Sequence, residues 1–142
     1  MPSTVFTKPK VLGDLLKAEF HPMFNRESSK VKNGQAGACA LTDALAYPLK
    51  ADGVGYQLAI AGDEANVIAL LLVQGPLDIA AGATTAEYLP LLVRGPCVIN
   101  QSALAAKDIA AANFTIATLV TRLKTLNFVV RTEPTKTNTQ TL

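Results

Sequence analysis

Histidine and cysteine, which often bind metals or act as nucleophiles, are scarce in this chain. Its 142 residues include one histidine and two cysteines. His21 precedes Pro22 and has no second histidine with which to share a metal, so we interpret it as part of an exposed turn. Cys39 and Cys97 lie in apolar segments without a neighbouring ligand, which predicts buried, reduced thiols. We therefore expect no metal centre and no cofactor.

Charge is scarce as well. Charged residues make up 17% of the chain, against an average of about 25% in globular domains. The net charge is +2 and the basic residues are scattered, so there is no basic stripe of the kind that nucleic-acid binding requires. Hydrophobic residues reach 49%, more than a monomer easily covers. We expect some apolar surface to lie in contacts with other protein chains.

Long apolar runs are absent. The longest, residues 67–73 and 89–93, are well short of the ~20 residues that cross a bilayer. Residues 1–10 contain prolines and lysines in place of the continuous apolar core of a secretory signal. The sequence therefore predicts a soluble protein that is not exported and does not bind membranes.

Two polar segments resemble parts of catalytic motifs. Ser28 and Ser29 stand near Lys30 and Lys32, but these polar surroundings would not desolvate a lysine enough to lower its pKa for a Ser-Lys nucleophile. The glycine-rich segment 53–55 lacks the Lys-Ser/Thr that follows a phosphate-binding loop. We therefore predict that the protein is not an enzyme.

Short apolar segments separated by turn residues dominate the middle of the chain, which is typical of β-strands. The predicted strands are 37–41, 47–50, 56–60, 67–73, 91–93, 97–99 and 128–131. Segments 71–79 (LLVQGPLDI) and 91–99 (LLVRGPCVI) resemble each other at an offset of 20 residues. Two copies are too few for a solenoid, so they predict two similar strand–break–strand units in one sheet system.

Two helical segments are expected after Asn100. The first is the alanine-rich 102–112, with Ser102 as a possible cap, and the second is 113–126. The apolar positions of the second recur at helical spacing: Ile116, Leu119, Val120 and Leu123. Asn127 can end this helix in a left-handed conformation.

The predicted fold class is mainly β with a minor α component, a small barrel or sandwich with one clear helix in its C-terminal half. Residues 1–35 have apolar anchors but little periodicity, so we interpret them as an extended N-terminal arm. Residues 36–131 form the β-rich domain, and 132–142 a flexible tail. The arm could lie along the sheet edge of another chain, or its leucines could cover the domain's own core. The residues leave both interpretations open.

Three segments carry a family resemblance. They are 11–16 (VLGDLL), 92–100 (LVRGPCVIN) with Leu104 just after it, and 123–131 (LKTLNFVVR). In this order and spacing they resemble the lambda-type phage head decoration proteins, over residues 11–131. Asn127 stands where many members carry glycine, and Ile-Ala-Leu-Leu at 68–71 where they tend to have Gly-Ile-Leu-Leu.

The resemblance implies a β-clip-type domain that forms a homotrimer. Such trimers bind the major capsid protein on the outside of the expanded phage head, at its three-fold and local three-fold positions, and stabilise it against the pressure of packaged DNA. The protein would then be located on the outer capsid surface of the virion, after assembly in the host cytoplasm. The candidate capsid contacts are Val11, Leu12, Gly13, Asp14, Leu15 and Leu16. Arg94 and Arg131 are candidates for protomer or capsid contacts, although surface solvation is the simpler interpretation of both.

Two other functions fit the same sequence. One is another phage structural protein, such as a tail or connector component. The other is a trimeric β-clip nucleotide hydrolase similar to dUTPase. Those enzymes use Gly-rich and Asp-bearing motifs and a Gly-Phe-Gly tail, which this chain lacks.

Overall fold

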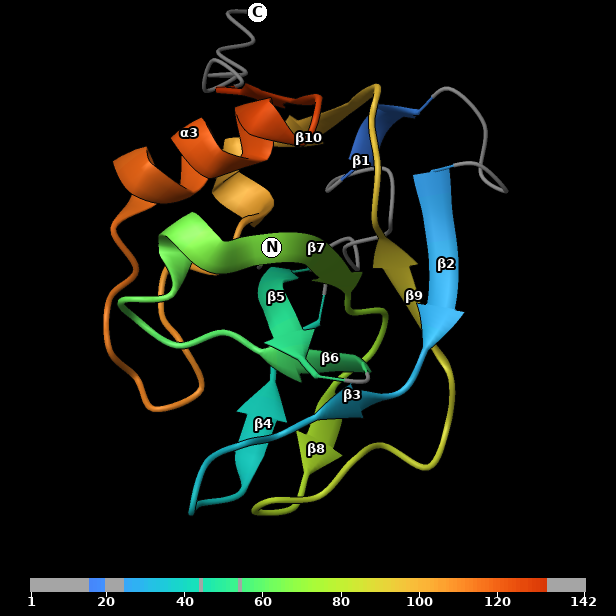
Figure 1. Cartoon of the computed structure of the whole chain (residues 1–142), viewed down its shortest axis with the longest axis vertical. Helices are drawn as coiled ribbons and strands as arrows, with labels where there is room; N and C mark the ends of the chain where they lie inside the picture. Colours follow the sequence, from blue (N-terminus) through green and yellow to red (C-terminus); the bar gives the residue numbers. More distant parts are fainter. Residues whose placement is uncertain (1–15, 20–24, 44, 54, 133–142) are drawn as a thin grey trace, which may run out of the picture.

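The computed structural model describes residues 16–19, 25–43, 45–53 and 55–132. Figure 1 shows their strands and helix. The largest sheet consists of β2 (Arg26–Ser29), β3 (Val31–Lys32), β5 (Ala46–Asp52), β6 (Gly55–Leu58), β7 (Val67–Leu72) and β9 (Leu89–Leu92). These six strands are ordered β2-β9-β7-β5-β6-β3.

Two smaller sheets lie on either side of the six-stranded sheet (Figure 1). One is three-stranded, in the order β1-β10-β11, and the other is the ribbon β4-β8. Their bounds are β1 (Leu16–Glu19), β4 (Cys39–Leu41), β8 (Leu77–Ile79), β10 (Cys97–Asn100) and β11 (Phe128–Arg131). The α-helix is α3 (Ile116–Thr125), and η1 (Glu64–Asn66) and η2 (Gln101–Ala103) are short 3-10 helices. The predicted mainly β class with one clear helix is confirmed, and all three sheets are open.

The centre of the fold is β7, whose sequence Val-Ile-Ala-Leu-Leu-Leu is apolar throughout because both faces of the strand are covered. Leu70 and Leu72 face a cluster that contains Leu119 and Leu123 of α3. Ala69 and Leu71 face a second cluster that includes Leu41 and Ile79 of the ribbon. In Figure 1 the helix and the ribbon accordingly lie on opposite sides of β7.

The helix α3 begins three residues later than predicted and ends at the predicted cap. The N–H of Asn127 donates to the carbonyl of Lys124, and the φ of Asn127 is 64°. Leu119 and Leu123 are fully buried. The left-handed cap at Asn127 and the strand that follows it are therefore confirmed.

We expect Asn127→Gly to change the free energy of unfolding by less than about 1 kcal/mol, because glycine adopts the left-handed conformation without a steric penalty. Asn127→Val should instead cost about 2 kcal/mol, because a β-branched residue is strained there. Urea denaturation of the two variants measures the difference. Equal stability of the two would contradict this account of the cap.

The described part of the predicted arm is built into the sheets. Leu16 pairs with Ile99 in β10, β2 pairs antiparallel with β9, and β3 pairs parallel with β6. The β2 sequence Arg-Glu-Ser-Ser has no apolar alternation because this edge strand is held mainly by backbone hydrogen bonds. Residues 16–19 and 25–35 therefore belong to the domain, whereas 1–15, 20–24 and 133–142 lie outside the described residues.

The predicted helix over 102–112 is wrong. Only η2 is helical there, and the side chain of Asn100, not Ser102, accepts a hydrogen bond at its start. Asp108 Oδ1 accepts hydrogen bonds from the N–H groups of Ala110 and Ala112, and Ala111 has a φ of 64°. Side-chain bonds of this kind favour a loop over a helix in spite of the alanine content.

The two similar segments start in neighbouring strands and end on opposite sides of the fold. β7 and β9 are adjacent in the six-stranded sheet. After Gly75-Pro76 the chain enters the ribbon as β8, and after Gly95-Pro96, whose peptide bond is cis, it enters the three-stranded sheet as β10. Each Gly-Pro thus marks a passage from the central sheet to an outer one.

Candidate interaction surfaces

Five polar residues are buried in the described part of the chain: Asn25, Asn33, Glu64, Asn100 and Asp108. No buried side-chain nitrogen or oxygen among the described residues lacks a hydrogen-bond partner. Burying such groups is costly unless they are bonded, so these residues hold backbone segments in place. The sequence patterns did not indicate any of them as buried.

Glu64 joins η1 to the start of α3. Its Oε2 accepts a hydrogen bond from the N–H of Gly62 at 2.9 Å, and its Oε1 accepts one from the N–H of Thr115 at 2.8 Å. Thr115 is the N-cap residue of α3. Burial acts to raise the pKa of Glu64, but these hydrogen bonds outweigh it, and the pKa is lowered.

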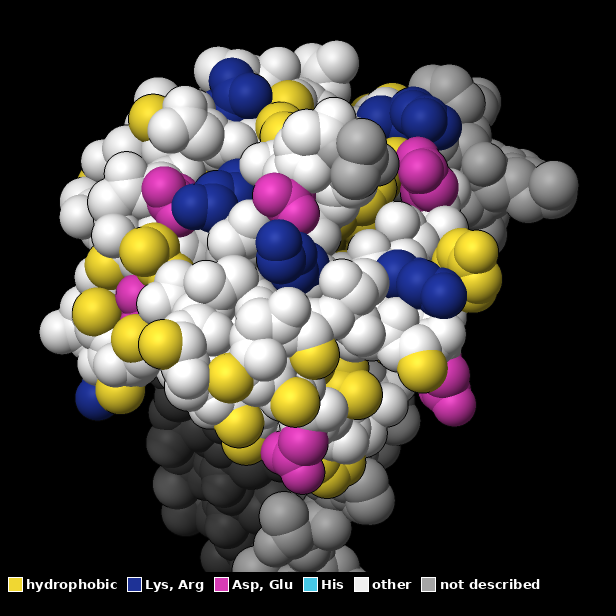
Figure 2. Space-filling view, turned by 60° about the horizontal axis from the view of Figure 1, so that its bottom comes forward, with side chains coloured by type: hydrophobic (Ala, Val, Ile, Leu, Met, Phe, Trp, Pro, Cys, Tyr) yellow, Lys and Arg dark blue, Asp and Glu magenta, His cyan; other side chains and the backbone are white. Residues whose placement is uncertain are grey.

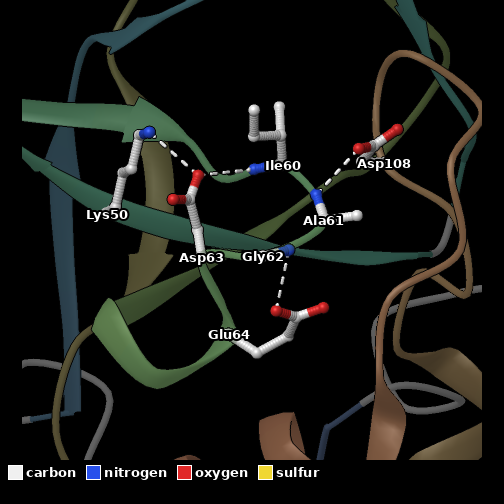
Figure 3. Close-up of polar contacts among 7 residues, drawn as sticks. All are labelled: Lys50, Ile60, Ala61, Gly62, Asp63, Glu64 and Asp108. Carbon is white, nitrogen blue, oxygen red and sulfur yellow. Dashed lines mark hydrogen bonds and ion pairs between the residues drawn. The ribbon is translucent and has the colours of Figure 1, made fainter.

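Two more carboxylates hold the turn before η1 (Figure 3). Asp63 Oδ2 accepts hydrogen bonds from the N–H of Ile60 at 3.0 Å and from Lys50 Nζ at 2.8 Å. Asp108 Oδ2 accepts one from the N–H of Ala61 at 2.8 Å. The pKa of Asp63 is lowered because its bonds to Lys50 and Ile60 outweigh the effect of burial. In this arrangement the acids bind backbone amides and one lysine, which is a structural role.

In the described ranges, no three His, Cys, Asp or Glu side chains are grouped so that they could hold a metal ion. Cys39 and Cys97 are both buried and outside any disulfide, which confirms the predicted buried, reduced thiols. Burial raises the pKa of Cys39, so this thiol is less reactive than an exposed one. In the Ser-Lys segment, Ser29 Oγ donates to the carbonyl of Lys30, and Lys30 Nζ lies 5.5 Å from the centre of the Tyr88 ring. Neither contact joins a serine hydroxyl to a lysine amine, as a Ser-Lys nucleophile requires.

The predicted contact residues lie in different places. Leu16 is buried in the domain's own core, which for this residue favours the second interpretation of the arm, and 11–15 are outside the described residues. Arg94 lies in the loop between β9 and β10, with a guanidinium nitrogen 3.9 Å from Glu27 Oε2. Arg131 is exposed at the end of β11.

Asn25 organises the loop that carries Arg94. Its Nδ2 donates to the carbonyl of Arg94 at 2.8 Å and to that of Pro96 at 3.1 Å. Its own carbonyl accepts the N–H of Val93 at 2.9 Å. The position of the Arg94 backbone is therefore set by a buried residue that precedes β2.

One exposed apolar surface lies along the edge strand β11, and we call it the β11 surface. It surrounds a hollow of about 610 Å³ lined by Pro96, Lys124, Asn127, Phe128, Val129 and Val130. The side chain of Val129 is exposed although it lies in a strand, with an exposed fraction of 51%. Lys124 and Arg131 supply positive charge at this surface.

A second apolar surface, the β8–β9 surface, consists of two adjoining hollows of about 360 Å³ each. Leu77, Glu87 and Leu89 line both hollows, and Asp78 lines one of them. Tyr88, between Glu87 and Leu89 in the chain, has an exposed fraction of 70%. The charged side chains that line the two hollows are therefore acidic, whereas the exposed Tyr88 ring has Lys30 Nζ at 5.5 Å from its centre.

The end of the molecule that carries the ribbon β4-β8 is seen in Figure 2. Hydrophobic side chains, uncharged polar side chains and backbone make up most of the lower half of this face, with a few charged groups among them. Lys, Arg, Asp and Glu are interspersed over the upper half. The face therefore has apolar area without a continuous field of one sign.

Within the described residues, no helix has the length and apolar character needed to span a lipid bilayer. Comparisons of the chain with protein-family models, with curated proteins and with solved structures found no match.

Proposed function

We propose that this chain is a capsid decoration protein, which binds the outer surface of an expanded phage head as a homotrimer. One observation supports the proposal most. Three separate segments resemble the decoration proteins, and strands from all three form one sheet: Leu16 in β1, then β10, then β11. The described parts of the three segments are therefore adjacent in space, although they are distant in sequence.

The proposed activity is thermodynamic and requires no catalysis. A protein whose binding sites exist only on the expanded shell stabilises that shell by mass action, because binding lowers the free energy of the expanded state alone. A trimer makes three linked contacts, so the effective concentration of the second and third is high and each contact can be weak. The exposed apolar area of the domain gives such contacts a place to form.

The proposal is tested by sedimentation velocity of the purified protein, alone and mixed with phage shells. We expect a trimer that co-sediments with expanded, undecorated shells and does not co-sediment with precursor shells. A monomer that binds neither kind of shell would contradict the proposal. Binding to both kinds would contradict its state selectivity.

Deletion of residues 1–14 is expected to reduce binding to expanded shells by at least a hundredfold, if the arm adds a strand to a sheet edge of the capsid protein. The deletion stops before β1 because Leu16 belongs to the core of the domain. Circular dichroism and sedimentation of the shortened chain alone should be unchanged. Retained shell binding would contradict the role of Val11, Leu12, Gly13 and Asp14.

A further inference from the structure

We propose that the trimer is held by a contact between two different surfaces, in which the β11 surface of one copy binds the β8–β9 surface of the next. This inference rests on the homotrimer of the proposed function and names the residues that form it. The partner is a second copy of this chain.

The first argument is apolar exposure. Only two large hydrophobic side chains are highly exposed among the described residues, Tyr88 and Val129. Val129 lines the hollow of the β11 surface, and Tyr88 lies in the chain between Glu87 and Leu89, which line both hollows of the β8–β9 surface. Exposed apolar groups that adjoin hollows are typical of the centre of protein interfaces, where tyrosine is enriched. If each side chain enters the hollow of the other surface, a single contact removes both from water.

The second argument is charge complementarity. Lys124 lines the hollow of the β11 surface and Arg131 ends the strand beside it, and both are exposed. Glu87 lines both hollows of the β8–β9 surface and Asp78 lines one, and these two are exposed as well. Opposite charges around apolar hollows favour the pairing of the two surfaces with each other. They disfavour pairing of either surface with itself.

The third argument is the position of the surfaces. In Figure 1 the strand β11 and the ribbon strand β8 lie at opposite ends of the view. Surfaces at opposite ends let one copy bind two neighbours, one through its β11 surface and the other through its β8–β9 surface. A head-to-tail contact generates a closed ring when its rotation closes, and a trimer is such a ring. In addition β11 is an edge strand of its described sheet, so its backbone is available at the contact.

The experiment reverses one charge on each surface. Lys124→Glu and Glu87→Lys should each weaken self-association by roughly tenfold or more, because like charges then face each other. The double variant Lys124→Glu/Glu87→Lys restores opposite charges and should form trimers again. Lys107→Glu is the matched control, since Lys107 is exposed and lines none of the three hollows. Sedimentation velocity measures the association, and circular dichroism verifies the fold of each variant.

Trimers that persist in both single variants would overturn the inference, as would a double variant no more associated than the single ones. A mass that grows steadily with concentration would overturn the closed ring. If the natural chain is trimeric but binds no expanded shells, the proposed function fails and the interface stands. If shells are bound while the charge reversals have no effect, only the interface fails.

Discussion

Replacing Gly95 by alanine is expected to lower the free energy of unfolding by about 3 kcal/mol, the upper range for adding a methyl group where there is no room. A Cβ at this position would overlap the backbone carbonyl of Asn127. That carbonyl cannot easily move, because Asn127 is held in the left-handed cap that ends α3. The N–H of Gly95 also donates to the carbonyl of Leu126 at 3.3 Å, which keeps the two segments together.

Gly37→Ala is the matched control, since a Cβ there would meet nothing within 4 Å. Urea denaturation should show a loss for Gly95→Ala and a change of less than about 0.5 kcal/mol for Gly37→Ala. Equal stability of the two variants would contradict the close packing of this loop against the helix end.

Gly75 is the counterpart of Gly95 in the other Gly-Pro segment. A Cβ at Gly75 would meet nothing within 4 Å, and its φ is 86°. Glycine is thus required at position 95 for close packing against Asn127, and at position 75 for its positive φ.

The substitution Glu64→Gln should lower the free energy of unfolding by about 3 kcal/mol at neutral pH. It removes a hydrogen bond to a charged group and leaves a buried donor without its partner, and such losses reach about this size. The amide presents one NH2 group where the carboxylate had an acceptor. One of the two N–H groups, of Gly62 or of Thr115, would then face a donor. The start of α3 should loosen first, because Thr115 precedes it.

The same residue predicts how stability depends on pH. Because folding lowers the pKa of Glu64 below its ordinary value of about 4.5, its stabilisation is complete above that value and is lost as the pH falls through the folded pKa. Asp63 acts in the same direction. Glu64→Gln should therefore lose less stability than the natural chain between pH 5 and pH 3, in about the range where carboxylates titrate.

Glu27→Gln serves as the control, since Glu27 is exposed and its pair with Arg94 spans 3.9 Å. Exposed pairs of this kind contribute little. Denaturation midpoints of the three proteins at several pH values test the prediction. An acid response of Glu64→Gln that parallels the natural chain would show that Glu64 is not the group that titrates.

Sequence patterns predicted best those elements whose side chains alone specify them. The apolar run of β7 is buried on both faces, the spacing of Leu119 and Leu123 indicates one face of α3, and Asn127 indicates its end. In each case the burial or backbone preference of single residues determines the outcome. The elements were therefore recognisable without knowledge of their partners.

The other elements depend on partners that are distant in the chain. The polar strand β2 exists because β9 offers it a backbone edge. The alanine-rich segment after Asn100 is a loop because Asp108 binds its amides and also the N–H of Ala61. Glu64 is buried because Thr115, 51 residues later, supplies a donor. No local pattern indicates such pairings, which is why residues 25–35, this loop and the buried acids were missed.

In the three-stranded sheet, the first and last described strands, β1 and β11, lie on either side of β10. Leu16 stands opposite Ile99, and Arg131 stands beside Asn100, so both ends are level with the same end of β10. Only β10 separates them, a span of about 10 Å. A short linker could therefore join the two ends into a circularly permuted chain, with new termini in an exposed turn. For the same reason, a peptide fused before β1 and one fused after β11 would leave the domain side by side.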